Sequence, residues 1–291
     1  MKSLVLFLLL LSSLFAFDLE MMDLSSYKIA NGKTVLITFQ MQKGIELESA
    51  KVGKKEFQIF DTPNNPKQKY LLLPFSYYAA KGNKEVFIKY EEGAKQKQEK
   101  ILLKVIDGHY AKEEIHVSSA KVNPRSEEVK ERIAKEYREA MKIYRTITPK
   151  SYITKEFIFP LESKITSDFG KARVYNGSLK GYHSGTDYRA KVGTPIKAAN
   201  DGRVALVKNR FYSGGTVLLD HGEGIYTCYF HMSAFRVKEG AMVKRGEILG
   251  LSGKSGRVTG PHLHFSARIN AVQVDPLQLI EIMNKKLLRG K

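Results

Sequence analysis

Residues 258–269 read VTGPHLHFSARI, a turn followed by an apolar strand, and this segment decides how the C-terminal half of the chain folds. Successive side chains of a β-strand point to opposite faces of the sheet. His262, His264 and Ser266 are therefore expected to share one face, while the apolar residues between them enter the core. Two imidazoles side by side on a sheet face can serve one reaction centre, one as a metal ligand and the other as an acid or base. Taken alone, the pattern is equally typical of two structural histidines on an ordinary strand.

A second candidate pair, His183 and Asp187, stands four residues apart in the segment HSGTD. A helix would bring the two side chains together, but Gly181, Gly185 and Thr186 argue against a helix. A straight strand would separate their Cα atoms by about 13 Å, which is too far for a shared metal ion. The chain is therefore predicted to bend near Gly185, as glycine permits.

A third candidate is His231, at the end of the strand predicted from Ile225 onward. Strand alternation predicts that Tyr229 and His231 share one face and that Cys228 points to the other. Cys228 is the only cysteine, so it cannot form an intramolecular disulfide, and it is interpreted as a small buried apolar residue. His221, just before a turn, is interpreted as a structural hydrogen-bonding residue or a surface residue.

The surroundings of these histidines favour a metal site in a β domain. Five of the chain's seven histidines and most of its 23 glycines lie from about residue 157 onward, among short predicted strands. Such dense turn signals are typical of a tightly turned all-β domain. Zinc-type metals prefer imidazole and carboxylate ligands on elements stiff enough to hold a tetrahedral site.

The order of these elements, HxxxD, then YxH, then HxH within VTGPHLHF, resembles the lysostaphin/LytM-type zinc peptidases of family M23. Phrases such as SDFG at 167–170 and GTPI at 193–196 fit as well, and the resemblance covers roughly residues 158–280. It implies an antiparallel β peptidase domain over residues 151–291. Arg257 and Ser266 depart from the common pattern at positions that could alter substrate contacts.

Carried over residue by residue, the resemblance makes His183, Asp187 and His264 the ligands of one Zn²⁺ per chain. It makes His231 and His262 the catalytic pair. Three protein ligands leave a fourth position for water, as in catalytic rather than structural zinc sites. His262 is our choice for general base, and His231 would then stabilise the oxyanion or pass a proton to the leaving amine, with the division of these roles between the two left open by the sequence.

The resemblance further implies a peptidoglycan substrate, with hydrolysis of a stem-peptide cross-link by a D,D-endopeptidase. Two alternatives stay open. One is a catalytically inactive LytM-like regulator of another cell-wall hydrolase, although such relatives lack ligands that are all present here. The other is a latent enzyme in which the N-terminal domain or the connecting helix covers the site in a regulatory contact.

The N-terminal half reads as a small β-sandwich of Ig-like type over residues 17–110. Strands are predicted at 34–39, 56–60, 70–75, 85–90 and 100–105, separated by turn signals. A linker and connecting helix follow over residues 111–150, with Asn123 as N-cap and Pro124 at the first helical position. The residues predicted to form its buried apolar stripe recur at helical spacing. They are Val129, Ile133, Tyr137, Met141 and Tyr144.

Residues 1–16 have the pattern of a cleaved signal peptide, with Lys2, an apolar run of about eight residues and small residues up to Ala16. The run is short against the roughly 20 residues of a spanning helix, so a periplasmic protein without an integral membrane segment is expected. The net charge of +18 favours anionic partners. Export and the absence of any nucleic-acid-binding motif argue against nucleic acid among them.

Overall fold

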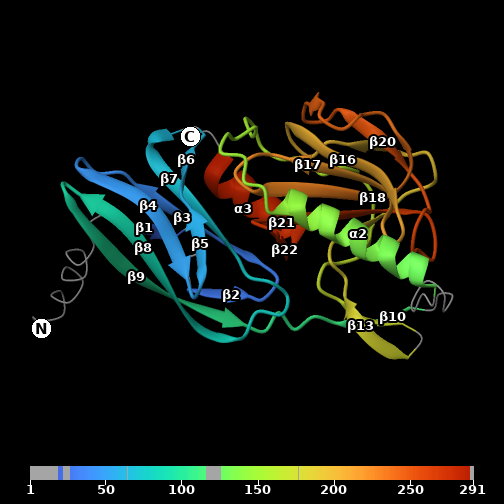
Figure 1. The fold of residues 1–291 in the computed structure, drawn as a ribbon, viewed down its shortest axis with the longest axis horizontal. Helices are drawn as coiled ribbons and strands as arrows, with labels where there is room; N and C mark the ends of the chain where they lie inside the picture. Colours follow the sequence, from blue (N-terminus) through green and yellow to red (C-terminus); the bar gives the residue numbers. More distant parts are fainter. Residues whose placement is uncertain (1–18, 22–26, 64, 116–125, 176, 289–291) are drawn as a thin grey trace, which may run out of the picture. The chain divides into compact units, whose positions relative to one another are not determined.

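The computed structural model describes residues 19–21, 27–63, 65–115, 126–175 and 177–288. These residues form two compact units (Figure 1). The first holds Val35–Leu73 and Gly82–Val105 together with the described residues up to Ile29. The second holds Ala30–Thr34, Pro74–Lys81 and the chain from Ile106 onward. None of the helices in the described ranges combines the length and the apolar character needed to cross a membrane.

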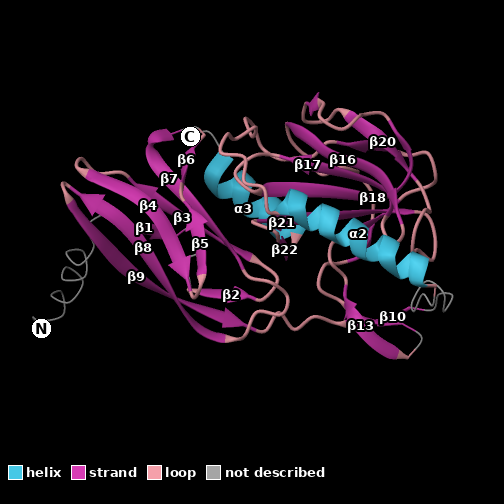
Figure 2. Ribbon diagram, in the orientation of Figure 1, coloured by secondary structure: helices cyan, strands magenta, loops and turns pink. Residues whose placement is uncertain are grey.

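Both units consist mainly of strands, which confirms the predicted fold class (Figure 2). One sheet of the N-terminal half has the order β1 (Leu19–Met21), β3 (Thr34–Gln40), β7 (Asn65–Pro74) and β6 (Phe60–Thr62). The other has the order β2 (Lys28–Ala30), β9 (Lys95–Ile106), β8 (Gly82–Glu92), β4 (Ile45–Val52) and β5 (Lys55–Gln58). Buried and more exposed side chains alternate along β8 and β9, so one face of their sheet is buried.

The five strands predicted in this half correspond to β3, β5 with β6, β7, β8 and β9. The strand β4 was not predicted. Its pairing with β8 shifts register between Leu47 and Ser49, and a bulge of this kind interrupts the alternation by which a strand is recognised. The Ig-like connectivity stays a prediction.

The second unit is built on an antiparallel sheet that carries the candidate residues. Its main path runs β11 (Ile165–Ser167), β14 (Thr186–Arg189), β21 (His262–Ile269), β18 (Ile225–Phe235), β17 (Gly214–Asp220), β16 (Gly202–Arg210) and β19 (Met242–Val243). The strands β20 (Ile248–Ser252), β15 (Pro195–Lys197) and β22 (Val272–Val274) pair beside this path. The adjacent pairs are antiparallel, as predicted for this half of the chain.

A small sheet of β10 (Lys112–Ile115), β12 (Ala172–Tyr175) and β13 (Ser178–Tyr182) belongs to the same unit. β12 and β13 form an antiparallel hairpin. β10 comes from the predicted linker and pairs with β12 in parallel, from Lys112 opposite Ala172 to Ile115 opposite Tyr175. The linker is therefore part of the unit that carries the site.

The connecting helix is α2 (Glu127–Tyr144), with Ser126 as its N-cap. The predicted cap residues Asn123 and Pro124 lie outside the described residues. Tyr144 of α2 packs into a buried cluster on the sheet with Tyr226 and Cys228. This placement confirms Cys228 as a buried free thiol. Two further helical segments end the described chain, α3 (Pro276–Ile282) and η1 (Met283–Leu288).

The predicted stripe of α2 is wrong at Tyr137, whose side chain is 62% exposed. Glu136 is buried instead. Its carboxylate accepts hydrogen bonds from Arg132 Nε at 2.8 Å and from the Phe211 backbone N–H at 2.9 Å. The position of the neighbouring strands decides which face of the helix is buried. On α2 the buried residue is Glu136, which has hydrogen-bond partners, and not Tyr137 as the apolar pattern predicted.

Candidate metal and catalytic centre

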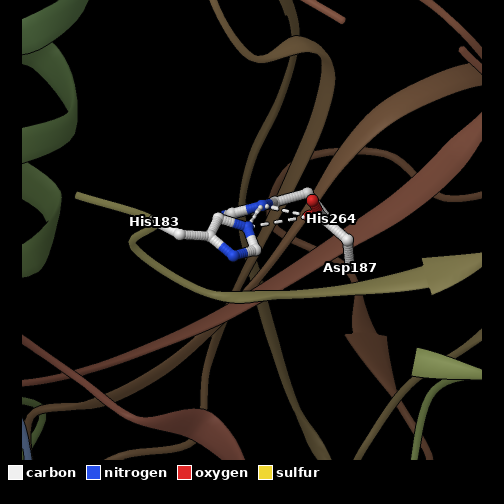
Figure 3. A group of neighbouring side chains, drawn as sticks. All are labelled: His183, Asp187 and His264. Atoms are coloured by element: carbon white, nitrogen blue, oxygen red, sulfur yellow. Dashed lines mark hydrogen bonds and ion pairs between the residues drawn. The ribbon is translucent and has the colours of Figure 1, made fainter. Parts of the chain in front are cut away.

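Three side chains converge where β14 lies beside β21 (Figure 3). Asp187 stands directly opposite His264 in the antiparallel pairing, and His183 reaches the same point from the segment before β14. Asp187 Oδ1 lies 2.9 Å from His183 Nε2 and 2.7 Å from His264 Nδ1. The two imidazole nitrogens are 3.0 Å apart. The structure therefore brings together the three residues predicted to be metal ligands, and all three are buried.

The chain bends at Gly185, as predicted, but the structure gives the glycine a different reason. A Cβ atom there would lie 2.4 Å from the Phe265 carbonyl oxygen and 2.6 Å from His264 Nε2. Real Cβ atoms do not approach other atoms so closely. Glycine at 185 is thus required by the close approach of this segment to β21, which holds His264 near His183 and Asp187.

The donor set fits a zinc-type ion. His183 Nδ1 lies 2.7 Å from the Asp168 carbonyl oxygen. A carbonyl oxygen only accepts, so Nδ1 carries a proton and Nε2 is the nitrogen that could present a lone pair to a metal ion shared with Asp187 and His264. Ligand atoms about 2.0–2.1 Å from a tetrahedral zinc lie about 3.3 Å apart, so the three atoms need to spread by only about half an ångström to hold one.

The electrostatics of the cluster favour the ligand forms of its side chains. Burial raises the pKa of Asp187, but hydrogen bonds with His183 and His264 lower it by more, and the net pKa lies well below the usual range. Burial lowers the pKa of His264 to about 4, although the Asp187 carboxylate opposes this shift. Asp187 is therefore ionised and His264 neutral near pH 7, as metal coordination requires.

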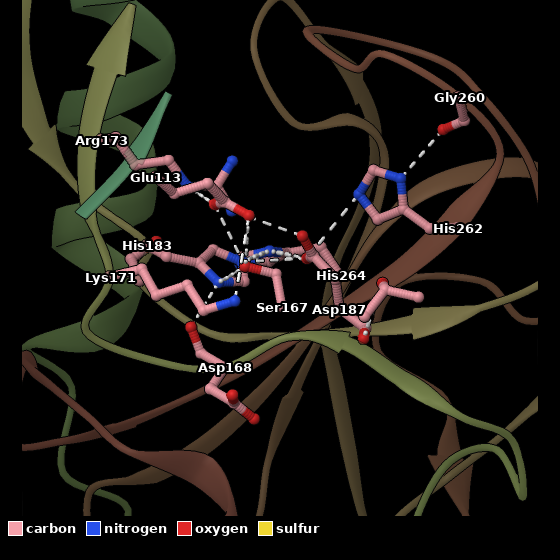
Figure 4. A network of polar contacts seen from close by, with 12 residues as sticks. Glu113, Ser167, Asp168, Lys171, Arg173, His183, Asp187, Gly260, His262 and His264 are labelled. Atoms are coloured by element: carbon pink, nitrogen blue, oxygen red, sulfur yellow. Dashed lines mark hydrogen bonds and ion pairs between the residues drawn. The ribbon is translucent and has the colours of Figure 1, made fainter. Parts of the chain in front are cut away.

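His231 and His262, the predicted catalytic pair, lie next to this cluster. Their ring centroids are 4.8 Å apart. His231 Nδ1 is 2.8 Å from the Ser255 carbonyl oxygen. His262 Nδ1 is 2.9 Å from the Gly260 carbonyl oxygen (Figure 4). Each Nδ1–H thus donates to a backbone carbonyl and leaves Nε2 with a lone pair. Burial, followed by the nearby His262 and His264, holds the pKa of His231 well below its usual value.

The predicted face of His231 is wrong, although its place in the site is not. Alternation puts His231 with Tyr229, whose ring packs against Phe265. Instead its ring lies 6.0 Å from that of His264, on the face where Phe230 stacks on His264. His231 has a φ of 62°, and the pairing of β18 with β17 shifts register at the same place. This left-handed residue turns the imidazole toward the cluster, a conformation that histidine adopts more readily than most residues.

His221 lies away from this centre. It is fully buried, with Nδ1 2.6 Å from the Asp201 carbonyl oxygen and Nε2 2.7 Å from the Thr227 hydroxyl. Burial lowers its pKa to about 4. His221 is therefore the structural hydrogen-bonding residue of the two alternatives.

The structure adds charged residues that the sequence did not reveal. Arg173 Nη2 on β12 lies 3.3 Å from Asp187 Oδ2, and Arg173 Nε lies 3.2 Å from Glu113 of β10 (Figure 4). Arg173 is thus placed between a predicted metal ligand and a carboxylate of the linker. No sequence motif identifies Glu113 or Arg173, and Glu113 lies more than 70 positions before Asp187 in the sequence. Only the tertiary pairing of β10 with β12 brings them together.

These residues line one cleft of about 500 Å³, which is within the range typical of small-ligand sites. Glu113, Ser167 and Arg173 form part of its lining together with the predicted ligands and the catalytic pair. Arg257 also lines the cleft, and its guanidinium lies 4.3 Å from the centre of the Tyr212 ring. The sequence departure at 257 therefore falls on the lining of this cleft.

Comparison with known proteins agrees with this geometry. Residues 181–276 match the model of Peptidase family M23. Peptidoglycan DD-endopeptidase ShyA of Vibrio cholerae is 38% identical over 123 residues, which are 41% of this chain and 29% of that protein. DD-carboxypeptidase/endopeptidase Mpg of Neisseria meningitidis is 43% identical over 97 residues, which are 33% of this chain and 22% of that protein. The matches thus span less than a third of these curated relatives.

A crystal structure from Pseudomonas aeruginosa, described as that of a candidate M23 peptidase, is similar over a longer stretch. It covers 86% of this chain and 94% of its own, with a TM-score of 0.65 and 25% sequence identity. The shared fold therefore includes strands outside the region matched by the family model. With the cluster of His183, Asp187 and His264 inside that region, these findings assign residues 181–276 to peptidase family M23.

Proposed function

We propose that this protein is a zinc-dependent endopeptidase that hydrolyses a stem-peptide cross-link of peptidoglycan, as a D,D-endopeptidase. The observation that carries the proposal is the buried cluster of His183, Asp187 and His264 with two further imidazoles beside it. The names of ShyA and Mpg support peptidoglycan as the substrate.

The protein's own residues divide the work around the ion. A zinc ion held by the three ligands would polarise the scissile carbonyl and lower the pKa of a water molecule toward about 7. His262 Nε2 presents a lone pair 3.7 Å from Asp187 Oδ1. That carboxylate stabilises the imidazolium which forms when His262 takes a proton from the attacking water. His262 is therefore the general base.

His231 also presents an unprotonated Nε2, because its Nδ1–H is held by Ser255. In this state it has no proton to donate to an oxyanion. Its ring lies 4.8 Å from that of His262, so it can receive a proton within the pair and then stabilise the oxyanion or protonate the leaving amine. Both roles require His231 to gain a proton during turnover, against the burial that keeps it neutral at rest.

An inactive LytM-like regulator is not favoured, because every predicted ligand and both imidazoles are in place. Export to the periplasm is proposed from residues 1–16, and the net charge of +18 suits anionic wall polymers. We also propose a regulatory restraint on the centre by the chain upstream of it, since Glu113 of the linker lines the cleft.

The experiment is incubation of the purified full-length protein with cross-linked muropeptides, with and without a zinc chelator. His264→Ala is the matched variant, because it removes one ligand. Cleavage should be lost in the chelated wild type and in His264→Ala. Added zinc should restore cleavage to the chelated wild type. Undiminished cleavage by His264→Ala would exclude the zinc mechanism. If the full-length wild type stays inactive with zinc added, a shortened chain that begins near Ser151 distinguishes two cases: cleavage by the shortened chain points to the upstream restraint, and no cleavage by either chain points to the regulator. Fractionation of the producing cells tests the periplasmic location.

A further inference from the structure

A carboxylate already lies in the cleft, held by groups that could hold another. The Ser167 hydroxyl lies 3.2 and 3.1 Å from the two carboxylate oxygens of Glu113. Arg173 Nε lies 3.2 Å and Lys171 Nζ 4.0 Å from the same carboxylate (Figure 4). We refer to Ser167, Lys171 and Arg173 as the carboxylate cradle. One hydroxyl donor and two cations form a binding set for an anionic group.

The cradle adjoins the reaction centre. Ser167 Oγ lies 3.2 Å from His183 Nδ1, and Arg173 Nη2 lies 3.3 Å from Asp187 Oδ2. Each of these two cradle residues therefore touches a predicted metal ligand. A carboxylate held in the cradle therefore lies beside the predicted metal ligands.

Glu113 fills the cradle incompletely. Arg173 Nε is buried, and within the described part of the chain it has no acceptor in hydrogen-bonding geometry, although Glu113 is close enough for an ion pair. A buried donor without an aligned acceptor is unfavourable. The Ser167 hydroxyl has one proton to share between the two oxygens of Glu113. A carboxylate that approached from the cleft could align with both groups at once.

Glu113 is also placed where it can leave. β10 has four residues, lies at the edge of its small sheet and pairs with β12 alone among the described strands. The Glu113 side chain is 28% exposed, against 15% for Arg173. Its rotation out of the cradle would uncover two cations and break no pairing within the main sheet.

We propose that the carboxylate cradle is the subsite for a free carboxylate of the substrate peptide, and that Glu113 occupies it until substrate displaces it. This inference rests on the proposed function for the identity of the peptide. The Glu113 carboxylate supplies the same charge and the same two oxygens as the group it stands in for. Moving Glu113 out of the cradle therefore costs free energy each time a substrate binds.

The test measures binding by calorimetry, using a monomeric stem peptide that has no cross-link to cleave. The peptide is used with its carboxylates free and with them amidated, on the zinc-loaded wild type and on Glu113→Gln. Glu131→Gln is the control with the same change of charge, because Glu131 is exposed on α2. Lys171→Gln combined with Glu113→Gln weakens the cradle through the Lys171 side chain, which lies 4.0 Å from Glu113. The Lys171 carbonyl oxygen, which accepts a hydrogen bond from the His183 N–H at 2.7 Å, is kept in this variant.

Glu113→Gln should bind the free-carboxylate peptide about tenfold more tightly than the amidated one, the effect expected for one charge-assisted hydrogen bond. The preference should be smaller in the wild type and in Glu131→Gln, where Glu113 competes, and smaller again when Lys171→Gln is added. Equal binding of the two peptides by Glu113→Gln, or binding of neither, overturns the inference. A far-ultraviolet circular dichroism spectrum identical to that of the wild type shows that the variant is folded.

Cleavage of cross-linked muropeptides, measured on the same samples, separates this inference from the proposed function. Zinc-dependent cleavage without a carboxylate preference would leave the endopeptidase standing and remove the cradle. A carboxylate preference in a protein that never cleaves would keep the cradle and remove the endopeptidase.

Discussion

Replacement of Gly185 by alanine tests whether close approach to β21, rather than backbone freedom, fixes this glycine. The new Cβ would lie 2.4 Å from the Phe265 carbonyl oxygen, 2.6 Å from His264 Nε2 and 2.8 Å from Ser266 Cβ. Ordinary contact begins at 3.4 Å, so the segment and β21 have to separate by roughly 1 Å. The strain of such overpacking costs about 1–3 kcal/mol.

The same displacement acts on metal binding, because His264 is one of the neighbours that has to move. Metal–ligand distances tolerate only about 0.2 Å of error, so a shift of roughly 1 Å should weaken zinc affinity at least tenfold. Alanine lowers the conformational entropy of the unfolded chain relative to glycine. This stabilises the folded protein by about 0.4–1 kcal/mol, which does not cancel the strain. We therefore expect a net loss of stability together with a loss of zinc affinity.

The assay is urea unfolding of the metal-free protein, combined with zinc titration against a chromophoric chelator. Gly260→Ala is the matched control, since nothing lies within 4 Å of its Cβ position and it also stands beside the centre. Equal stability and equal zinc affinity in Gly185→Ala and Gly260→Ala would refute the close-approach explanation.

Three further predictions follow from the site and from α2. The free energy of unfolding of the metal-free protein should fall between about pH 6.5 and 4, because the buried His264 and His221 take up their protons at a lower pH when folded than when unfolded; urea unfolding at several pH values measures this. Glu136→Ala should destabilise the protein by about 1–3 kcal/mol by orphaning the Phe211 N–H, whereas Tyr137→Ala should change stability by less than about 0.5 kcal/mol, both measured by thermal unfolding. His231→Asn should keep the fold and zinc content but lower kcat about 10²- to 10⁴-fold; an unchanged kcat would remove His231 from catalysis.

The metal ligands could be predicted from the sequence because each lies in a short pattern whose local geometry is strongly restricted. An HxH strand places two imidazoles on one face, and the bend at Gly185 is required once His183 and Asp187 have to meet. The antiparallel register that sets Asp187 opposite His264 then follows from pairing of the two strands. The order of the motifs along the chain, which resembles that of the M23 peptidases, then identified these residues as ligands.

The cradle could not be predicted, because its parts are assembled by pairing between distant segments. Glu113 and Arg173 meet only because β10 lies parallel to β12, and neither strand has a pattern that names its partner. A four-residue strand with three charged residues reads as linker in the sequence. Local propensity therefore gave no signal for a carboxylate beside the centre.

The error at His231 has a physical cause that bears on the chemistry. Regular alternation would have turned its imidazole toward Phe265, on the face opposite the metal ligands. The left-handed backbone at φ 62° reverses that direction, and such a residue costs on the order of 1–3 kcal/mol unless its surroundings hold it in place. Two contacts do so: the His231 N–H donates to the Ser213 carbonyl oxygen at 2.8 Å, and Nδ1 donates to that of Ser255. The strained conformation is thus maintained by the fold, and its consequence is an imidazole with a free Nε2 beside His262. Asparagine also tolerates this left-handed backbone but has no imidazole to accept or donate a proton. His231→Asn therefore removes the catalytic group and keeps the backbone conformation.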